Sequence, residues 1–266
     1  MWIDAHCHLG FSTFLSPSND QAAVIQRALD VGVTTLINVG CDLESSRTSL
    51  VLAQEHSFIF CTLGVHPNEA NLWNGEIEKQ FREWIDKDRS QAEGNRIVGI
   101  GEIGLDYFRN GASKDVQHDA FRGQISLAQK YDLPIMIHCR DAFEDAFKIL
   151  DECSPRRVVF HCFSGDLRLA STIWERGWVT SFTAVVSYPK NEGLREVVKA
   201  CPKELYFLET DAPFLPHQEL RGKRNEPAYV PRLGQDFAQL RQEPLDQIAI
   251  QSTRNVEVFF DLRNRF

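Results

Sequence analysis

Eight short apolar runs alternate with longer helical patterns along almost the whole chain. This alternation constrains the fold more than any other feature. The strand-like runs are Trp2–Ala5, Thr35–Val39, Ile59–Gly64, Ile97–Gly101, Pro134–His138, Val158–His161, Trp178–Phe182 and Leu205–Glu209. The helical patterns are Asp20–Val31, Ser45–Glu55, Ile77–Asp86, Gln117–Tyr131, Ala142–Cys153, Leu167–Arg176, Leu194–Ala200, Pro231–Arg241 and Pro244–Phe260. Such spacing indicates right-handed βαβ units and a parallel sheet. Eight strands favour a (β/α)8 TIM-type barrel, although an open doubly wound sheet also satisfies the pattern.

The composition is that of one globular domain. The chain has 266 residues, of which 43% are hydrophobic, and this is enough for a sizeable core. It contains no Pro/Gly/Ser-rich linker and no break in composition, so we predict a single domain over residues 1–266. The net charge of −8 argues against a basic surface that binds nucleic acid non-specifically, but it allows a local positive pocket.

The cysteines and the N-terminus bear on the compartment. Seven cysteines with no C-x-x-C pair indicate reduced thiols. No apolar run approaches the ~20 residues of a membrane span. The first strand begins at Trp2, which leaves no space for a signal peptide ahead of it. We therefore expect a cytoplasmic protein, a monomer with no membrane association and no protein partner.

Six residues of metal-ligand type stand at or just after strand-like runs. They are His6, His8, Glu102, His138, His161 and Asp211. Parallel strands bring their carboxyl ends to one edge of a sheet, and in a barrel the active site lies there. Each residue alone has a structural explanation, such as a buried ion pair or a satisfied histidine. Their recurrence at the same end of so many strands predicts a metal site.

The spacing and number of these residues suggest two ions. His6 and His8 are two apart, so on a strand they face the same way while Cys7 faces away. Asp211 follows the eighth strand, which neighbours the first in a closed barrel. Four histidines and two carboxylates exceed one tetrahedral site with an open position. We assign His6, His8 and Asp211 to one divalent ion and His138 and His161 to the other, with Glu102 bridging.

The sequence pattern leaves two or more roles possible for several other residues. His66, after the third strand, is a ligand, a substrate contact or a structural residue. Arg140 is a phosphate contact or a partner of a helix acid. Asp106 is a turn residue or a partner of a metal ligand. The long loop Ala212–Ala228 carries a basic run that is a solvated loop or a phosphate contact. Three residues without strand context are expected at the surface or in loops: His56, His118 and His217.

Taken together, these motifs resemble the TatD family of metal-dependent deoxyribonucleases, within the amidohydrolase-like barrels. The matching segments are DAHCHL at 4–9, GVHP at 64–67, GEIGLDY at 101–107, LPIMIHCRDA at 133–142, HCFSG at 161–165, LETDAPFL at 208–215 and RGKRNEP at 221–227. The resemblance implies a TIM-type barrel and the same six ligands. It also implies a role near the substrate for His66 and Arg140, and we predict substrate contacts from Arg224 and Asn225 of the last motif.

The resemblance further implies hydrolysis of DNA, as a 3′→5′ exonuclease on single strands, with Mg, Mn or Zn as the cation. We expect a metal-held hydroxide to attack phosphorus and Asp211 to take the proton, so Asp211 and Glu102 are the predicted catalytic residues. The expected substrate is the end of a DNA strand. The main alternative is a small-molecule amidohydrolase, esterase or lactonase on the same barrel, because fold does not settle function. A metal-stabilised binding protein is a third possibility.

Overall fold

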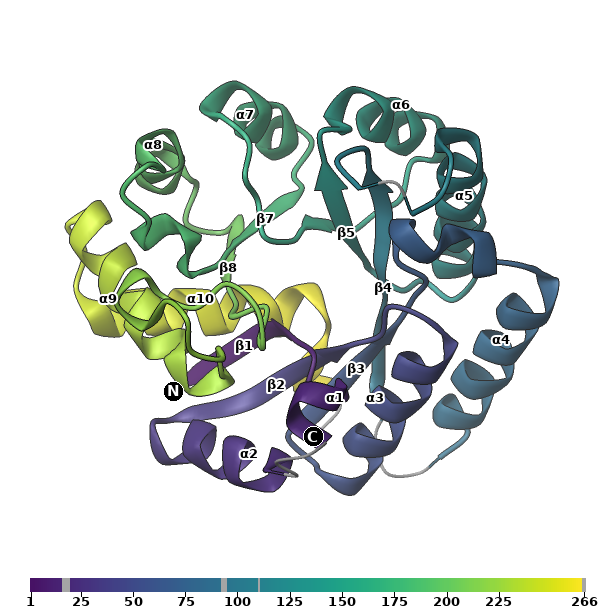
Figure 1. Ribbon diagram of the computed structural model, residues 1–266, viewed down its shortest axis with the longest axis horizontal. Helices are drawn as coiled ribbons and strands as arrows, with labels where there is room; N and C mark the ends of the chain where they lie inside the picture. The colour runs from purple at the N-terminus through teal and green to yellow at the C-terminus, as the bar shows by residue number, and fades with distance from the viewer. Residues whose placement is uncertain (16–19, 92–94, 110, 265–266) are drawn as a thin grey trace. The chain divides into compact units, whose positions relative to one another are not determined.

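The computed structural model describes residues 1–15, 20–91, 95–109 and 111–264. Its eight strands form one parallel sheet in chain order, with helices between them (Figure 1). The strands are β1 (Trp2–Cys7), β2 (Val33–Val39), β3 (Ile59–Leu63), β4 (Ile97–Asp106), β5 (Ile135–Arg140), β6 (Val158–Phe160), β7 (Val179–Phe182) and β8 (Tyr206–Leu208). The predicted α/β class and the strand order of a (β/α)8 barrel are confirmed.

Helices fill the connections between the strands. The α-helices are α1 (Ser12–Leu15), α2 (Gln21–Asp30), α3 (Leu43–Glu55), α4 (Gly75–Arg89), α5 (Lys114–Lys130), α6 (Phe143–Cys153), α7 (Leu167–Glu175), α8 (Glu192–Ala200), α9 (Val230–Arg241) and α10 (Leu245–Phe259). The 3-10 helices are η1 (Pro67–Leu72), η2 (Ala184–Ser187), η3 (Gln218–Leu220), η4 (Pro227–Tyr229) and η5 (Leu262–Asn264). Among these described helices, none is long and apolar enough to cross a membrane.

By internal contacts the chain divides into two compact units. Unit 1 comprises Met1–Asn38 and Cys162–Val258, and unit 2 comprises Val39–His161 and Phe259–Phe266. The prediction of one domain over residues 1–266 stays a prediction.

Unit 1 is built around β1, all of whose residues are buried. β1 pairs with β2 on one side. On its other side it is hydrogen-bonded to the segment after β8: Asp211 N donates to His6 O at 2.9 Å, and His8 N donates to Ala212 O at 2.8 Å. Helix α9 packs on β1 and β8. A Cβ at Gly234 of α9 would lie 2.2 Å from the Trp2 ring, so only glycine permits this close approach.

Unit 2 holds β3, β4, β5 and β6, which pair in that order. Helix α3 packs on β3 and α5 packs on β4 (Figure 1). Local sequence sets where the helices begin. Asp42 and Ser45 form a capping box at the start of α3, and Asn74 and Ser113 cap α4 and α5 with their side chains.

Four strands extend further than their apolar runs predicted. β1 continues to Cys7, and β2 begins at Val33. The run Ile97–Gly101 continues as β4 to Asp106, and β5 continues to Arg140. The glycines near Glu102 do not end β4, because its pairing with β5 continues as far as Asp106 and Arg140. Glu102 therefore lies inside β4 rather than after its end, and His138 lies inside β5 rather than at its last position.

The sequence patterns missed α1 and the 3-10 helices. Two of these, η3 and η4, lie wholly or partly in the loop Ala212–Ala228 that was expected to be irregular. In the part of the chain that the structure describes, none of the seven cysteines forms a disulfide bond.

Candidate functional site

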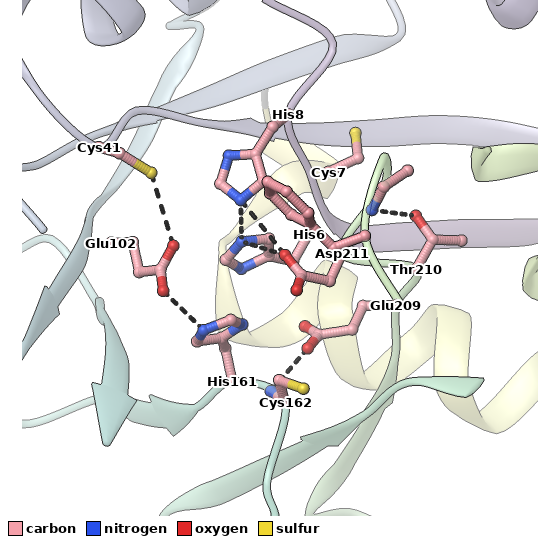
Figure 2. A network of polar contacts seen from close by, with 12 residues as sticks. His6, Cys7, His8, Cys41, Glu102, His161, Cys162, Glu209, Thr210 and Asp211 are labelled. Atoms are coloured by element: carbon pink, nitrogen blue, oxygen red, sulfur yellow. Dashed lines mark hydrogen bonds and ion pairs between the residues drawn. The ribbon is translucent and has the colours of Figure 1, made fainter. Parts of the chain in front are cut away.

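Three of the predicted ligands meet in unit 1. The Nε2 atoms of His6 and His8 are 3.0 Å apart, and they lie 3.5 and 3.3 Å from Asp211 Oδ1 (Figure 2). The alternation of β1 turns both imidazoles the same way, as predicted, while the Cys7 thiol donates to Ile37 O of β2. The backbone bonds between β1 and the segment after β8 bring Asp211 to this pair. The predicted proximity of Asp211 to the two histidines is confirmed.

The buried carboxyl group of Asp4 holds the segment that carries Asp211. Asp4 is fully buried; its Oδ1 accepts from Thr210 N at 2.9 Å, and its Oδ2 accepts from the Thr210 hydroxyl at 2.5 Å. The Thr210 hydroxyl in turn accepts from Ala212 N at 3.1 Å. Burial raises the pKa of Asp4 to about 8, although its hydrogen bonds from Thr210 lower it. Asp4 thus holds Thr210 directly, and Thr210 in turn holds Ala212 on the other side of Asp211.

Aromatic rings border the same cluster. Phe11 stacks on His8 with ring centroids 4.6 Å apart, and Phe214 meets both rings edge-on. Phe214 is 48% exposed, so part of its ring faces solvent. The ring stack favours the observed orientation of His8.

Unit 2 contains a second cluster around Glu102. Its Oε1 lies 2.7 Å from His161 Nε2, 2.8 Å from His138 Nδ1 and 3.4 Å from His66 Nε2. Burial alone would raise the pKa of Glu102. The histidines His161, His66 and His138 outweigh that effect through charge and hydrogen bonds, so its pKa is held well below the usual range. Glu102 is therefore a carboxylate.

His138 is held from both sides by carboxylates. Its Nε2 lies 3.0 Å from Asp106 Oδ2, and its Nδ1 faces Glu102. Asp106 Oδ1 accepts from the backbone N–H groups of Phe108 and Arg109, both at 2.9 Å. Burial would raise the pKa of Asp106, but His138 and these donors lower it to about 2. Asp106 thus directs Nδ1 of His138 toward Glu102 and contacts one of the predicted ligands.

His66 belongs to the unit 2 cluster as well. Its ring lies 4.4 Å from that of His138, and ligand atoms of His66, Glu102 and His138 all lie within 4.8 Å of one another. Its Nδ1 accepts from Asn68 N, which leaves Nε2 to face Glu102. A Cβ at Gly64 would lie 2.5 Å from the carbonyl carbon of Gly101, so glycine allows the end of β3 to approach β4 beside Glu102.

Both clusters have donors and spacings that suit a divalent metal ion. Zinc bonds to imidazole nitrogen and carboxylate oxygen at ~2.0–2.2 Å, and tetrahedral angles then separate the donor atoms by ~3.4 Å. The three distances in the unit 1 cluster are 3.0 to 3.5 Å. In unit 2, His161 Nε2 and His138 Nδ1 are 3.4 Å apart. His161 Nε2 and His138 Nδ1 lie 2.7 and 2.8 Å from Glu102 Oε1, which are hydrogen-bond distances. Any proton on these two nitrogens must leave before they can bind an ion.

The other residues predicted to contact substrate differ in how far their polar groups are already bonded to the protein itself. The Arg140 guanidinium lies 3.7 Å from the centre of the Phe108 ring, and Phe108 is 60% exposed. Arg224 makes a double contact with Asp20 at 3.0 and 2.6 Å and also bonds Glu226. Asn225 is 2% exposed, and its amide donates to backbone carbonyls, including those of Thr210 and Phe214.

Arg224 and Asn225 therefore serve the protein's own structure. Asn225 holds the loop after β8 against the segment next to Asp211, while Arg224 joins that loop to α2 through Asp20. Their predicted substrate contacts stay predictions, and the contacts described here lend them no support.

Some polar groups were missed or misplaced by the sequence analysis. His217 was expected at the surface, but it is 5% exposed and pairs with Asp236 of α9 at 3.1 Å. His118 on α5 lies 2.6 Å from the Tyr107 hydroxyl, which also donates to Asp145 at 2.5 Å. No local pattern marks such pairs, because their members come from different elements. For Asp106 the signal was present, a carboxylate four residues after Glu102 on the same strand.

Comparison with known proteins identifies relatives along almost the full length of the chain. The model of the TatD-related DNases matches residues 3–261. The chain is 35% identical to an uncharacterized metal-dependent hydrolase, YabD, of Bacillus subtilis, over 98% of this chain and 99% of that protein. It is 32% identical to a protein of Erwinia amylovora named as the 3′-5′ ssDNA/RNA exonuclease TatD, over 92% of this chain and 95% of that protein.

A solved structure is similar to this chain along almost its whole length. The TatD homologue YjjV of Escherichia coli K12 superposes with a TM-score of 0.90 at 30% identity, covering 98% of both chains. This similarity agrees with the eight parallel strands and the two clusters of candidate metal ligands. The chain therefore belongs to the TatD-related DNase family, as a metal-dependent hydrolase with a TIM-type barrel fold.

Proposed function

We propose that the protein is a nuclease that removes nucleotides from the 3′ end of single-stranded DNA with the help of divalent metal ions. The observation that carries the proposal is the pair of clusters of imidazole and carboxylate groups, spaced as metal ligands, in a chain whose relatives include proteins named as 3′-5′ exonucleases. Such donor sets suit zinc, manganese and related ions.

We propose that His6, His8 and Asp211 hold one ion and that His138 and His161 hold a second. The role of Glu102 as a ligand shared by both ions stays a prediction, as does the number of ions. His66 is in close contact with Glu102 and His138. It is therefore either a further ligand of the second ion or a residue beside the substrate. Bound ions would activate a water molecule near neutral pH and stabilise negative charge on the attacking and leaving oxygens.

The chain's own residues then have distinct tasks. Asp211 accepts the proton of the attacking water on a carboxylate oxygen, since it is the carboxylate of its cluster and is close enough to both imidazoles to share their site. Arg140 holds the phosphate, because its guanidinium is oriented by stacking on Phe108 and remains half-buried rather than fully buried. Hydrolysis breaks the bond from phosphorus to the leaving 3′ oxygen and forms a new bond from phosphorus to the water oxygen.

The net charge of −8 fits action at a strand end. Tight non-specific binding to a duplex needs many cationic contacts with phosphates, and its affinity falls steeply with salt. An enzyme that engages a few nucleotides needs few such contacts. We therefore expect a weak dependence of KM on salt.

The test uses protein stripped of metal and single-stranded DNA labelled at either end. With Mg, Mn or Zn added back, the expected result is early release of labelled mononucleotide from the 3′-labelled strand and progressive shortening of the 5′-labelled strand. Arg140→Gln should raise KM for DNA, whereas Arg156→Gln, on an exposed ion pair with Asp132, should behave like the parent protein.

Parallel assays distinguish the alternatives. A single-stranded RNA of the same sequence measures the sugar preference. A panel of chromogenic phosphodiesters, esters, lactones and amides tests the small-molecule hydrolase. Cleavage of an amide or lactone, with no cleavage of either nucleic acid by metal-loaded protein, would refute the nuclease proposal.

A further inference from the structure

Two aromatic side chains are exposed in the part of the chain that the structure describes, and both follow a residue of the ligand clusters or its partner. Phe108 is 60% exposed and comes two residues after Asp106, and Phe214 is 48% exposed and comes three residues after Asp211. The other described aromatic side chains are buried or half-buried. A single exposed apolar side chain is ordinary on a protein surface. Exposed rings at these two places and at no other described position indicate contact with a ligand.

The Phe108 ring is held beside the unit 2 cluster by short contacts. Its N–H donates to Asp106 Oδ1 at 2.9 Å, and Asp106 Oδ2 lies 3.0 Å from His138 Nε2. The Arg140 guanidinium lies 3.7 Å from the centre of the ring, where Asp106 and Arg140 pair at the ends of β4 and β5. One face of the ring therefore carries a guanidinium, and its exposure of 60% leaves the opposite face open to solvent.

Positive charge surrounds this ring. Arg109, Lys114 and Arg140 make no ion pair in the part of the chain that the structure describes. Arg109 is exposed, and the Lys114 ammonium lies 3.9 Å from the centre of the Tyr107 ring. This positive charge is local, because the chain as a whole has a net charge of −8. Proteins bind single-stranded nucleic acid with such a combination, because bases stack on rings and phosphates meet cations.

Phe214 has a different environment. It meets His8 and Phe11 edge-on, with ring centroids 6.1 and 6.0 Å away. These contacts make Phe214 part of the packing around His8. Phe108 instead packs on a guanidinium that can also bind phosphate, so it can place a base beside a phosphate.

We propose that Phe108 stacks on the base next to the scissile phosphate, so that the protein prefers substrates that carry a base at this position. This inference rests on the proposed nuclease function, in which Arg140 holds that phosphate. Stacking accepts any base, because every base has an aromatic face. The ring therefore selects nucleic acid over phosphodiesters without a base, and it does not select a sequence.

The test compares single-stranded DNAs that differ in one base. One strand is complete, and in the others an abasic nucleotide stands at the last or at the second-last position, so that each side of the first cleaved bond is covered. The value of kcat/KM is measured for the metal-loaded parent protein and for Phe108→Ala, Phe108→Leu and Phe108→Trp. Ile250→Ala on α10 is the matched control, because Ile250 is 66% exposed and apolar.

In the parent protein, loss of the base at one of the two positions should lower kcat/KM by about 5- to 150-fold, the range for stacking of one base on an aromatic ring. Phe108→Ala and Phe108→Leu should lose this preference for a base, mainly through a higher KM for the complete strand. Phe108→Trp and Ile250→Ala should keep it.

The base-dependent part of the effect separates stacking from a role in orienting Arg140. If Phe108→Ala lowers kcat/KM equally for the complete and the abasic strands, Phe108 only orients Arg140, and the proposal is overturned. A parent protein that cleaves DNA with no preference for a base would overturn it as well and leave the nuclease function intact. Failure of the metal-loaded parent to cleave any strand would refute the nuclease proposal and this inference with it.

A second measurement uses the parent protein alone and does not depend on the folding of a variant. A DNA strand carries 5-iodouracil beside the first cleaved bond, and a phosphorothioate at that bond slows cleavage. The complex with metal-loaded protein is irradiated, and the cross-linked peptide is identified by mass spectrometry, because iodouracil reacts preferentially with aromatic side chains that stack on it. A cross-link at Phe108 supports the proposal, whereas a cross-link at Phe214 instead would overturn it.

Discussion

Asp106→Asn tests whether a carboxylate outside the predicted ligand set controls His138, a predicted metal ligand. Asp106 Oδ2 lies 3.0 Å from His138 Nε2, and Oδ1 accepts from two backbone N–H groups. Because the two backbone donors keep the amide oxygen at the Oδ1 position, an asparagine presents its NH₂ group to His138. Two donors then face each other, and His138 shifts its proton to Nδ1, the atom that faces Glu102.

The magnitude follows from these contacts. Asp106 is 1% exposed, and its pKa of about 2 keeps it charged at neutral pH. Losing a hydrogen bond to a charged group costs roughly 1.5–3 kcal/mol. Since ~1.4 kcal/mol corresponds to a factor of ten, metal binding through His138 should weaken roughly 10- to 150-fold. This range agrees with the effect of roughly 10–100-fold found for partners of metal ligands in general.

The assay is zinc affinity measured by competition with a chromogenic chelator, with nitrogen-15 spectra of the histidine side chains to report the tautomer. Asp119→Asn, at an exposed position on α5, serves as the matched control. Unchanged zinc affinity in Asp106→Asn, or a His138 spectrum that keeps the proton on Nε2, would refute the reasoning.

Three further predictions concern the clusters and their surroundings. Asp211→Asn should lower kcat by about 100-fold or more while far-ultraviolet circular dichroism stays that of the parent, because an amide is a poor base; near-parental turnover would contradict its assigned role. Removal of metal with a chelator should lower the Tm measured by calorimetry, since free ion at 1,000 times its Kd adds about 4 kcal/mol of stability; an unchanged Tm would argue against bound ions. In metal-free protein the free energy of unfolding should fall as pH rises, because the Asp4 carboxyl is buried. Its pKa, raised from 3.8 to about 8, means that the folded state keeps a proton that the unfolded state releases, so the full stability is present below pH 4 and is lost on the way to pH 8. Urea denaturation should show the parent losing up to about 1.4 kcal/mol per pH unit relative to Asp4→Asn between pH 5 and 8. Parallel curves for the two proteins would show that Asp4 titrates normally.

The sequence by itself determined the order of the elements and much of the site. Apolar runs and helical periodicity depend on neighbours in the chain, and so they predicted all eight strands and nine of the ten α-helices in the described residues. The alternation of a strand was enough to place His6 and His8 on the same face. Neighbouring strands one and eight then implied the approach of Asp211, which the structure confirms.

Only the tertiary structure decided which partners the polar side chains have. The guanidinium of Arg224, for which a substrate contact stays a prediction, meets Asp20, which lies more than 200 residues away in the chain. His217 pairs with a carboxylate on α9, and Cys41 approaches Glu102 from a segment that carries no family motif. Periodicity shows which face a residue occupies, but hydrogen bonds and ion pairs form over about 3 Å between groups brought together from distant segments. That information exists only once the chain has folded.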